Sequence, residues 1–358
     1  MNSNFRLPGP TAVPPQVYAA MQRDMLPHRG AEFSAFYAEL LARLRRIHKT
    51  ESDVLTWPGS GSAGWEIAVT NFLSPGDEVV AMVAGAFGDR FAYVADRLGV
   101  KVHRVDLPWG SAIYPDMVRD ALDQHSDAKA VFLTHNETST GVTHPIPELA
   151  AVARERNVLT FVDGVSSVAG LPLDFDGWGI DYLMSGSQKA WMCPPGITIA
   201  AIGPRAWDAY EKSTFPKFFW DAGPMRDLAK DGHTTSTPPV SLDFALDAAA
   251  QMIEEEGLDN VHVRHASLGE QTRAGIEALG LELLAEPGFE SNTVTAVQLP
   301  NGLTAKAVIK QLYDDHGVTV AGGQAQIADS IIRIGHMGWV DADDIDNCLK
   351  AVKVVLGN

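Results

Sequence analysis

Short apolar segments alternate with helical patterns over most of the chain, and this alternation limits the fold more than any other feature. We predict strands at Val54–Trp57, Glu78–Val83, Lys101–Val105, Ala130–Thr134, Val158–Asp163, Tyr182–Met184 and Ile197–Ile202. The intervening segments have the apolar spacing of helices, at Ala63–Leu73, Phe87–Leu98, Pro115–Gln124 and Pro147–Arg156. Strands that alternate with helices form a mainly parallel sheet covered by helices on both faces. The predicted fold class is therefore α/β.

The last third of the chain follows a different pattern. A helical stretch from Ser241 to Leu279, interrupted at Gly257, leads to strand Val294–Leu299, helix Ala305–His316, strand Ile331–Ile334 and helix Asp343–Leu356. At the other end, Leu7 to Pro15 contains too many prolines for a helix or a central strand. The chain of 358 residues is longer than a domain with a single hydrophobic core usually is. We therefore predict an N-terminal arm at 1–20, a large domain at 21–255 and a smaller C-terminal α+β domain at 256–358.

Charge and composition exclude several classes of partner. The chain has 28 Lys and Arg against 45 Asp and Glu, a net charge of −17, which repels phosphate backbones and argues against nucleic acid. It contains neither an apolar run of about 18 residues nor the apolar core of a signal peptide. Its two cysteines, Cys193 and Cys348, are too few for a disulfide framework or a zinc site of the paired-cysteine type. We therefore expect a soluble cytoplasmic protein without a metal or a membrane partner.

A glycine-rich segment, Gly59–Gly64, follows one predicted strand and begins a helix. Its spacing matches the dinucleotide fingerprint G-x-G-x-x-G, but that fingerprint also needs an acid after the second strand. Here the second strand, Glu78–Val83, continues into Ala84-Gly85-Ala86, which disfavours dinucleotide binding. Exposed N–H groups and two hydroxyls at a helix N-terminus still attract an anion such as a phosphate. The alternative is a serine cap with glycines for close packing.

The segment Ser185–Lys189 places a lysine between apolar neighbours, and an acid, Asp163, ends the preceding strand. A strand-terminal Asp can keep the ring nitrogen of pyridoxal phosphate protonated, while a lysine on the next loop forms a Schiff base with its aldehyde. Burial and a positive neighbour would lower the pKa of Lys189, and Asp163 would need a cationic partner. The alternatives are a solvated loop lysine and an Asp that caps the turn through Gly164.

Ordered matches along nearly the whole chain show that it resembles the class V aminotransferases of pyridoxal phosphate fold type I. The resemblance is closest to the alanine/serine–glyoxylate aminotransferase family. The matching segments are Pro8–Thr11, Val13–Pro15, Gly59–Ser62, Gly85–Gly88, Thr134–Val142, Val162–Val165, Ser185–Lys189, Pro194–Gly196, Thr237–Leu242 and Arg333–Gly335. Where some members carry His and Trp, this chain has Ser62 and Phe87, which still supply a hydroxyl and an aromatic face.

This resemblance implies a role for each matching residue. Lys189 would carry the cofactor, and Asp163 would face its ring nitrogen. The remaining cofactor contacts would come from Ser60, Gly61, Ser62 and Gln188 at the phosphate, Phe87 and Val165 at the two ring faces, and Thr138 at the ring substituents or the substrate. Thr237, with Thr234 or Ser236, would reach the phosphate of the neighbouring subunit in a homodimer. Arg333 would bind the substrate carboxylate in a bidentate fork, unless it lies on the outer face of its strand.

The resemblance implies transfer of an amino group from a small L-amino acid of the alanine or serine type to a 2-oxo acid such as glyoxylate or pyruvate. Other class V enzymes remain alternatives, namely a 2-aminoethylphosphonate, ureidoglycine or pyridoxamine transaminase, or a lyase with a reactive cysteine. A protein that binds the cofactor without catalysis is a further alternative. The sequence does not identify the amino donor, nor does it define the roles of His28, Arg29 and Asn136.

Overall fold

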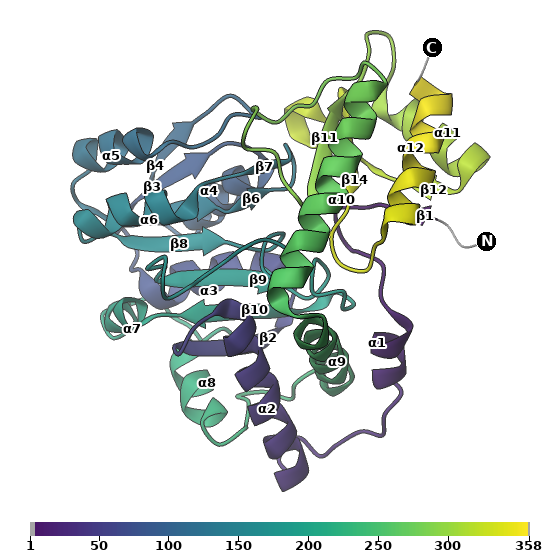
Figure 1. Ribbon diagram of the computed structural model, residues 1–358. Helices are drawn as coiled ribbons and strands as arrows, with labels where there is room; N and C mark the ends of the chain where they lie inside the picture. The colour runs from purple at the N-terminus through teal and green to yellow at the C-terminus, as the bar shows by residue number, and fades with distance from the viewer. Residues whose placement is uncertain (1–3, 357–358) are drawn as a thin grey trace.

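The computed structural model describes residues 4–356, which form a large sheet and a smaller one on either side of the long helix α10, Leu258–Ala278 (Figure 1). Within these residues the large sheet has seven strands in the order β2-β10-β9-β8-β5-β3-β4. Their bounds are β2 Asp53–Gly59, β3 Glu78–Val83, β4 Lys101–Asp106, β5 Ala128–Thr134, β8 Leu159–Asp163, β9 Tyr182–Gly186 and β10 Gly196–Ile202. Strand β10 runs antiparallel to both neighbours, and the other pairs are parallel. The predicted mainly parallel α/β fold is confirmed.

Helices cover both faces of this sheet (Figure 1). They are α3 Gly61–Phe72, α4 Ala86–Arg97, α5 Pro115–Gln124, α6 Ile146–Glu155, α7 Pro204–Tyr210 and α8 Ala222–Ala229. Every residue of β8 and β9 is buried, because helices pack on either side, and this explains why apolar residues predominate in both strands. The sequence did not predict α7 and α8, which are short and have proline in their first turns.

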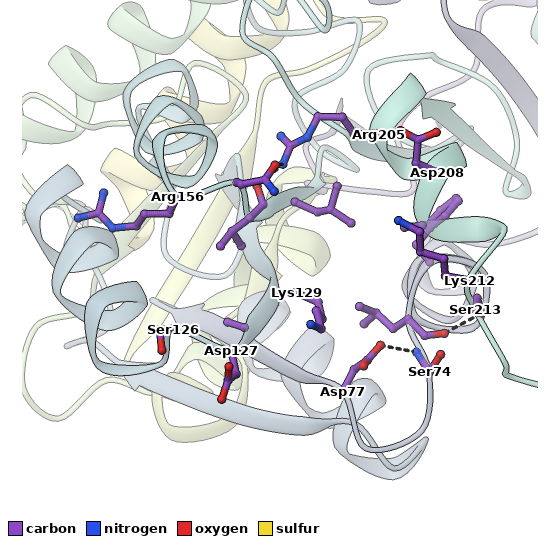
Figure 2. Close-up of a pocket in the computed structure, with 17 residues that line it drawn as sticks. Ser74, Asp77, Ser126, Asp127, Lys129, Arg156, Arg205, Asp208, Lys212 and Ser213 are labelled. Carbon is purple, nitrogen blue, oxygen red and sulfur yellow. Dashed lines mark hydrogen bonds between the residues drawn. The ribbon is translucent and has the colours of Figure 1, made fainter.

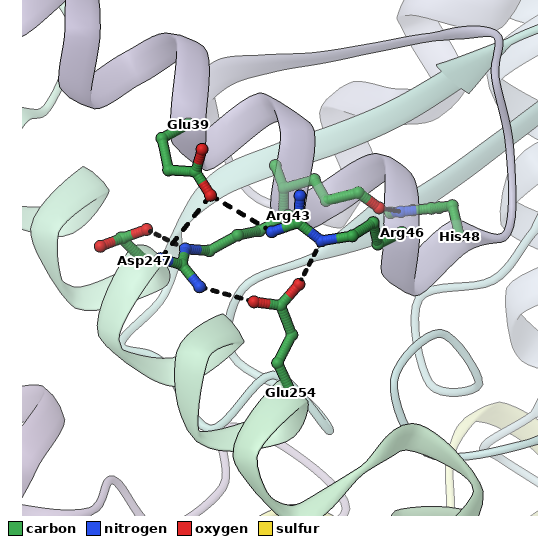
Figure 3. Close-up of polar contacts among 7 residues, drawn as sticks. Glu39, Arg43, Arg46, His48, Asp247 and Glu254 are labelled. Atoms are coloured by element: carbon green, nitrogen blue, oxygen red, sulfur yellow. Dashed lines mark hydrogen bonds and ion pairs between the residues drawn. The ribbon is translucent and has the colours of Figure 1, made fainter.

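Two helices near the N-terminus were also not predicted, α1 at Pro15–Ala20 and α2 at Ala31–His48. The segment Leu7–Pro15 was expected to contain no helix, and α1 begins only at its last residue, Pro15, which takes the first helical position, where a missing N–H costs nothing. Helix α2 packs against α9, Val240–Glu256, through ion pairs (Figure 3). Arg43 donates to Asp247 Oδ1 at 3.0 Å and to Glu254 Oε2 at 2.5 Å, and Arg46 donates to Glu254 Oε1 at 2.6 Å.

The smaller sheet has the strand order β11-β14-β13 and its own apolar cluster. Its elements are β11 Val294–Gln298, β13 Ala321–Gly322, β14 Ile331–Gly335, and the helices α11 Ala305–His316 and α12 Ala342–Leu356. The predicted interruption at Gly257 is confirmed, since this residue separates α9 from α10 with φ +84°. The domain boundaries at 20/21 and 255/256 stay predictions.

The N-terminal arm begins on the smaller unit and continues to the larger one. Strand β1, Asn4–Phe5, pairs in parallel with β12, Val318–Thr319. Further on, the Gly335 N–H donates to the Arg6 carbonyl at 2.7 Å, and the Thr11 N–H donates to the Gln188 carbonyl at 3.1 Å. The arm therefore passes from β14 to the loop that carries Lys189. None of the helices in the described part of the chain is long and apolar enough to cross a membrane.

Candidate active site

Several candidate residues meet at the carboxyl edge of the large sheet. Asp163 is the last residue of β8, and Lys189 follows the end of β9 by three residues. Helices α3 and α4 begin at the same edge, with Ser60 as the N-cap of α3 and Phe87 in the first turn of α4. Ligands bind at this edge in open α/β sheets. The topology alone therefore brings these four residues to one place.

Lys189 is buried, with 8% of its surface exposed, so it is not a solvated loop lysine. Its Nζ donates to the Pro8 carbonyl at 2.7 Å and lies 6.0 Å from the centre of the Phe87 ring. Burial and, to a lesser extent, the Arg333 guanidinium lower the pKa of this amine to about 8, although the Asp163 carboxylate opposes them. An amine with this pKa exchanges protons near neutral pH, which a base or nucleophile must do.

Asp163 is held by two neutral donors. The Val165 N–H donates to Oδ1 and the Trp65 indole Nε1–H donates to Oδ2, both at 2.9 Å. Burial raises the pKa of Asp163 to about 6, although these two donors and Lys189 lower it. Within residues 4–356 the carboxylate is held by neutral donors, and the predicted cationic partner, the ring nitrogen of the cofactor, stays a prediction. The hydrogen bond from the Val165 N–H also shows that Asp163 caps the turn through Gly164, which was the alternative role considered for this residue.

The segment at the start of α3 is open to a polar ligand. Ser60 and Ser62 are exposed, and the Ser60 side chain makes no capping hydrogen bond, so the simple capping role is not seen. A Cβ on Gly61 would lie 2.6 Å from the Val165 side chain, which explains the glycine. The buried Oε1 of Gln188 has no partner within residues 4–356. Free hydroxyls and helix N–H groups are donors that fit the phosphate of pyridoxal phosphate, and Gln188 could contribute to such a site only through its NH₂ group, because its amide oxygen is an acceptor.

Arg333 is buried, with 6% of its surface exposed, so it does not lie on the outer face of β14. Its Nε donates to the Gly322 carbonyl at 2.7 Å, and its Nη1 donates to the Thr138 carbonyl at 3.1 Å. No ion pair joins it to a carboxylate in the described part of the chain. Burial lowers the pKa of this guanidinium to about 10, while Glu137 raises it. A buried cation that lacks an anionic partner suits an anionic ligand.

Thr138 and Asn136 belong to one internal hydrogen-bond network. The Thr138 hydroxyl donates to Ser166 Oγ at 2.7 Å. The Asn136 amide donates to Ser166 Oγ at 2.8 Å and to Thr293 Oγ1 at 3.0 Å, and its oxygen accepts from Thr143. Asn136 is therefore occupied in joining the large sheet to the segment before β11.

The structure does not bring the segment Thr234–Thr237 into this group. Thr237 is exposed, and among residues 4–356 its hydroxyl makes no hydrogen bond to the start of α3. The Thr234 hydroxyl donates within the segment, to the Ser236 carbonyl at 2.7 Å. His28 is half-buried and Arg29 is exposed, without a hydrogen bond to the site residues.

Three residues of the site were missed by the sequence analysis, namely Pro8, Trp65 and Glu137. Glu137 is fully buried and accepts from the N–H groups of Phe87, Gly88 and Ser139 and from the Ser139 hydroxyl, which fixes the first turn of α4. Trp65 lies one turn after Gly61, so helical spacing could have placed it on the inner face of α3. The hydrogen bond between Lys189 and the Pro8 carbonyl could not be predicted from the sequence, because it depends on where the N-terminal arm lies in the fold.

A pocket of 650 Å³ lies at the opposite edge of the sheet, at the amino ends of β5 and β8 (Figure 2). Lys129, Arg205 and Lys212 line it together with Asp77, Asp127 and Asp208. This mixture of charges selects no single class of ligand, and Arg205 is already paired with Asp181. We therefore assign the catalytic site to the carboxyl edge of the large sheet, where Lys189 lies.

The two cysteines are free and buried. Burial raises the pKa of both the Cys193 and the Cys348 thiols, that of Cys348 to about 12, so neither forms a thiolate readily. Cys348 lies within α12 and not on an exposed loop. A lyase that depends on a reactive cysteine is therefore disfavoured.

Known proteins match this chain over almost its full length. The sequence profile of the family described as Aminotransferase class-V matches residues 8–347. Relatives include a soluble hydrogenase small subunit from Synechococcus sp., 39% identical and covering 98% of this chain and 92% of that protein. The L-aspartate–glyoxylate aminotransferase of Paracoccus denitrificans is 36% identical, covering 93% and 85%. The crystal structure of alanine–glyoxylate aminotransferase from Nostoc sp. aligns with a TM-score of 0.95 at 31% identity, covering 99% and 95%. The profile match contains every site residue from Pro8 to Arg333.

Proposed function

The chain belongs to the class-V aminotransferases, and we propose that it moves an amino group from a small L-amino acid to a 2-oxo acid such as glyoxylate or pyruvate. The observation that carries the proposal is that the buried Lys189 and Asp163 lie at the carboxyl edge of the large sheet, close enough to the buried Arg333 of β14 for its charge to lower the pKa of Lys189. Two of the named relatives use glyoxylate with different donors, aspartate and alanine. The oxo acid is thus better supported than the donor.

The cofactor of this family is pyridoxal 5′-phosphate. When bound, it supplies an aldehyde that takes up the substrate amine and a ring that accepts the electrons of the Cα–H bond. We assign attachment to Lys189 and the ring nitrogen to Asp163. Ser60, Gly61, Ser62 and Gln188 would hold the phosphate, while Phe87 and Val165 would cover the ring. Thr138 lies next to Arg333 and would contact the ring substituents or the substrate.

The protein then has to bind the substrate and move one proton. Arg333 would bind the substrate carboxylate with its remaining N–H groups, since two carbonyls already fix its orientation. Lys189 Nζ would take the proton from Cα and return it elsewhere, because its lowered pKa allows both states. The Pro8 carbonyl accepts a hydrogen bond from the amine, and the arm packs directly on the Lys189 side chain, since a Cβ on Gly9 would lie 2.4 Å from it.

We further propose a homodimer in which Thr237, with Thr234 or Ser236, reaches the phosphate of the neighbouring subunit. The exposure of large apolar side chains supports this proposal. These side chains are Tyr18, Met25, Phe218 and Phe219, and Phe218 is 91% exposed. Large apolar side chains that are exposed in one chain are candidates for subunit contacts, and the oligomeric state tests this. Analytical ultracentrifugation should give twice the chain mass of 38.6 kDa, and a monomer at micromolar concentration would contradict the proposal. The cytoplasmic location stays a prediction.

The proposed reaction is tested by half-reactions with single donors. We expect cofactor-loaded protein to lose its visible absorption band on addition of L-alanine, L-serine or L-aspartate, and to recover it with glyoxylate or pyruvate. Pyridoxamine, ureidoglycine and 2-aminoethylphosphonate test the alternatives in the same assay. A response to these donors alone would contradict the proposal, and so would a protein that binds the cofactor but responds to no donor.

A further inference from the structure

Trp65 is a buried aromatic residue on α3 whose polar atom contacts the site. It is 4% exposed, and its indole Nε1–H donates to Oδ2 of Asp163 at 2.9 Å. Its ring packs against Phe91 at a centroid distance of 6.3 Å and an interplanar angle of 25°. A buried Trp N–H usually finds a partner, and here the partner is the carboxylate that the proposed function assigns to the cofactor ring.

The position of this indole is fixed by the packing of α3 on β9. A Cβ on Gly64 would lie 2.5 Å from the Met184 sulfur, so the helix approaches the strand as closely as glycine permits. On the same turn, the Tyr182 hydroxyl donates to the Gly64 carbonyl at 2.7 Å. Because Trp65 follows Gly64 directly, its ring has little freedom to move away from Asp163.

The Asp163 carboxylate sits in surroundings that both favour and oppose its charge. It is 3% exposed, and burial together with the Glu137 carboxylate disfavours ionisation. The Lys189 ammonium and the two N–H donors favour ionisation, and the Tyr182 phenol is a further titratable group nearby. Any residue other than proline at position 165 would supply the backbone N–H, so the indole is the donor that depends on a particular side chain.

We propose that Trp65 is a positioning residue whose indole N–H keeps the Asp163 carboxylate ionised and fixes its orientation for the ring nitrogen of the cofactor. This inference rests on the proposed function. In this proposal Trp65 itself contacts neither the substrate nor the group that moves the Cα proton. It acts through Asp163, in the way that an outer-shell hydrogen bond fixes a metal ligand or a catalytic histidine.

The test is Trp65→Phe, which keeps an aromatic ring against Phe91 and removes the donor. The Asp163 carboxyl is titrated by carbon-13 NMR in the cofactor-free protein, with its signal assigned through Asp163→Asn. The midpoint of this titration should be about one pH unit higher in Trp65→Phe than in wild type. As the pH is lowered, cofactor affinity should begin to fall at a correspondingly higher pH in the variant than in wild type, since a protonated Asp cannot pair with a protonated ring nitrogen. We expect kcat to fall about tenfold with KM nearly unchanged.

Trp57→Phe is the matched control, because Trp57 is as buried but its Nε1 has no partner within residues 4–356. An equal shift in this variant, or overlapping titrations of Trp65→Phe and wild type, would overturn the role of Trp65. If Trp65→Phe does not fold, benzothienylalanine at position 65 preserves the fused ring without the N–H, and the same titration decides. A wild-type protein that binds no pyridoxal phosphate would refute the proposed function instead, independently of this comparison.

Discussion

Lys189→Ala should lower kcat of transamination by at least about 10⁴-fold, the largest effect of any single substitution in this chain. The substitution removes both the attachment point of the cofactor and the base that moves the Cα proton. A methyl group cannot replace the amine that now donates to the Pro8 carbonyl. Single-turnover kinetics with L-alanine measures the loss, and the visible absorption of the cofactor-loaded protein should change with it.

Lys217→Ala is the control, because Lys217 is a half-buried lysine that packs over the Tyr210 ring and lies outside the site. Near wild-type turnover is expected there. In the wild-type protein, the rate of cofactor capture should rise with pH, reach half of its maximum near pH 8 and level off above that pH, since the neutral amine is the nucleophile and burial lowers the pKa of Lys189 to about 8. Retention of more than a hundredth of kcat in Lys189→Ala would contradict the assignment.

The sequence predicted the strands of the large sheet well, because strands buried on both faces are continuous apolar runs between turns. It could not predict that β10 runs antiparallel, since Ile197–Ile202 is apolar in either direction. In the small sheet β11 and β14 were predicted, as was the break at Gly257, but the two-residue strand β13 was not. Helix α1 was missed because proline usually argues against helix, although it is tolerated at the first position.

The site was predictable to the extent that each residue carries its own chemical signal. Lys189 and Asp163 follow strands at the edge where ligands bind, and Arg333 stands out as a cation in an apolar strand. Their hydrogen-bond partners were not predictable, since these come from distant segments that only the fold brings together. At Asp163, for example, the Val165 N–H that donates to Oδ1 is local, but the Trp65 indole that donates to Oδ2 comes from α3, 98 residues earlier in the chain.

Arg333→Gln should lower kcat/KM for L-alanine by about 10²- to 10³-fold, mainly through KM. Loss of one partner from a buried, hydrogen-bonded charge pair costs about 2–5 kcal/mol, and each 1.4 kcal/mol is a factor of ten. Glutamine can still donate to one of the two carbonyls that now fix the guanidinium, at Gly322 or Thr138. The local fold should therefore survive, which the thermal midpoint and the cofactor absorption would show.

Two comparisons separate carboxylate binding from a general loss of stability. Ethylamine is alanine without its carboxylate, so wild type and Arg333→Gln should react with it at similar, low rates. Arg273→Gln removes another partly buried guanidinium, one that donates to the Ser291 carbonyl and to Asn292 Oδ1 in the smaller unit. That variant should lose stability without losing selectivity for alanine over ethylamine. If Arg333→Gln kept this selectivity, the substrate carboxylate would have to bind elsewhere, because the guanidinium would then serve only to join β14 to the loop at Thr138.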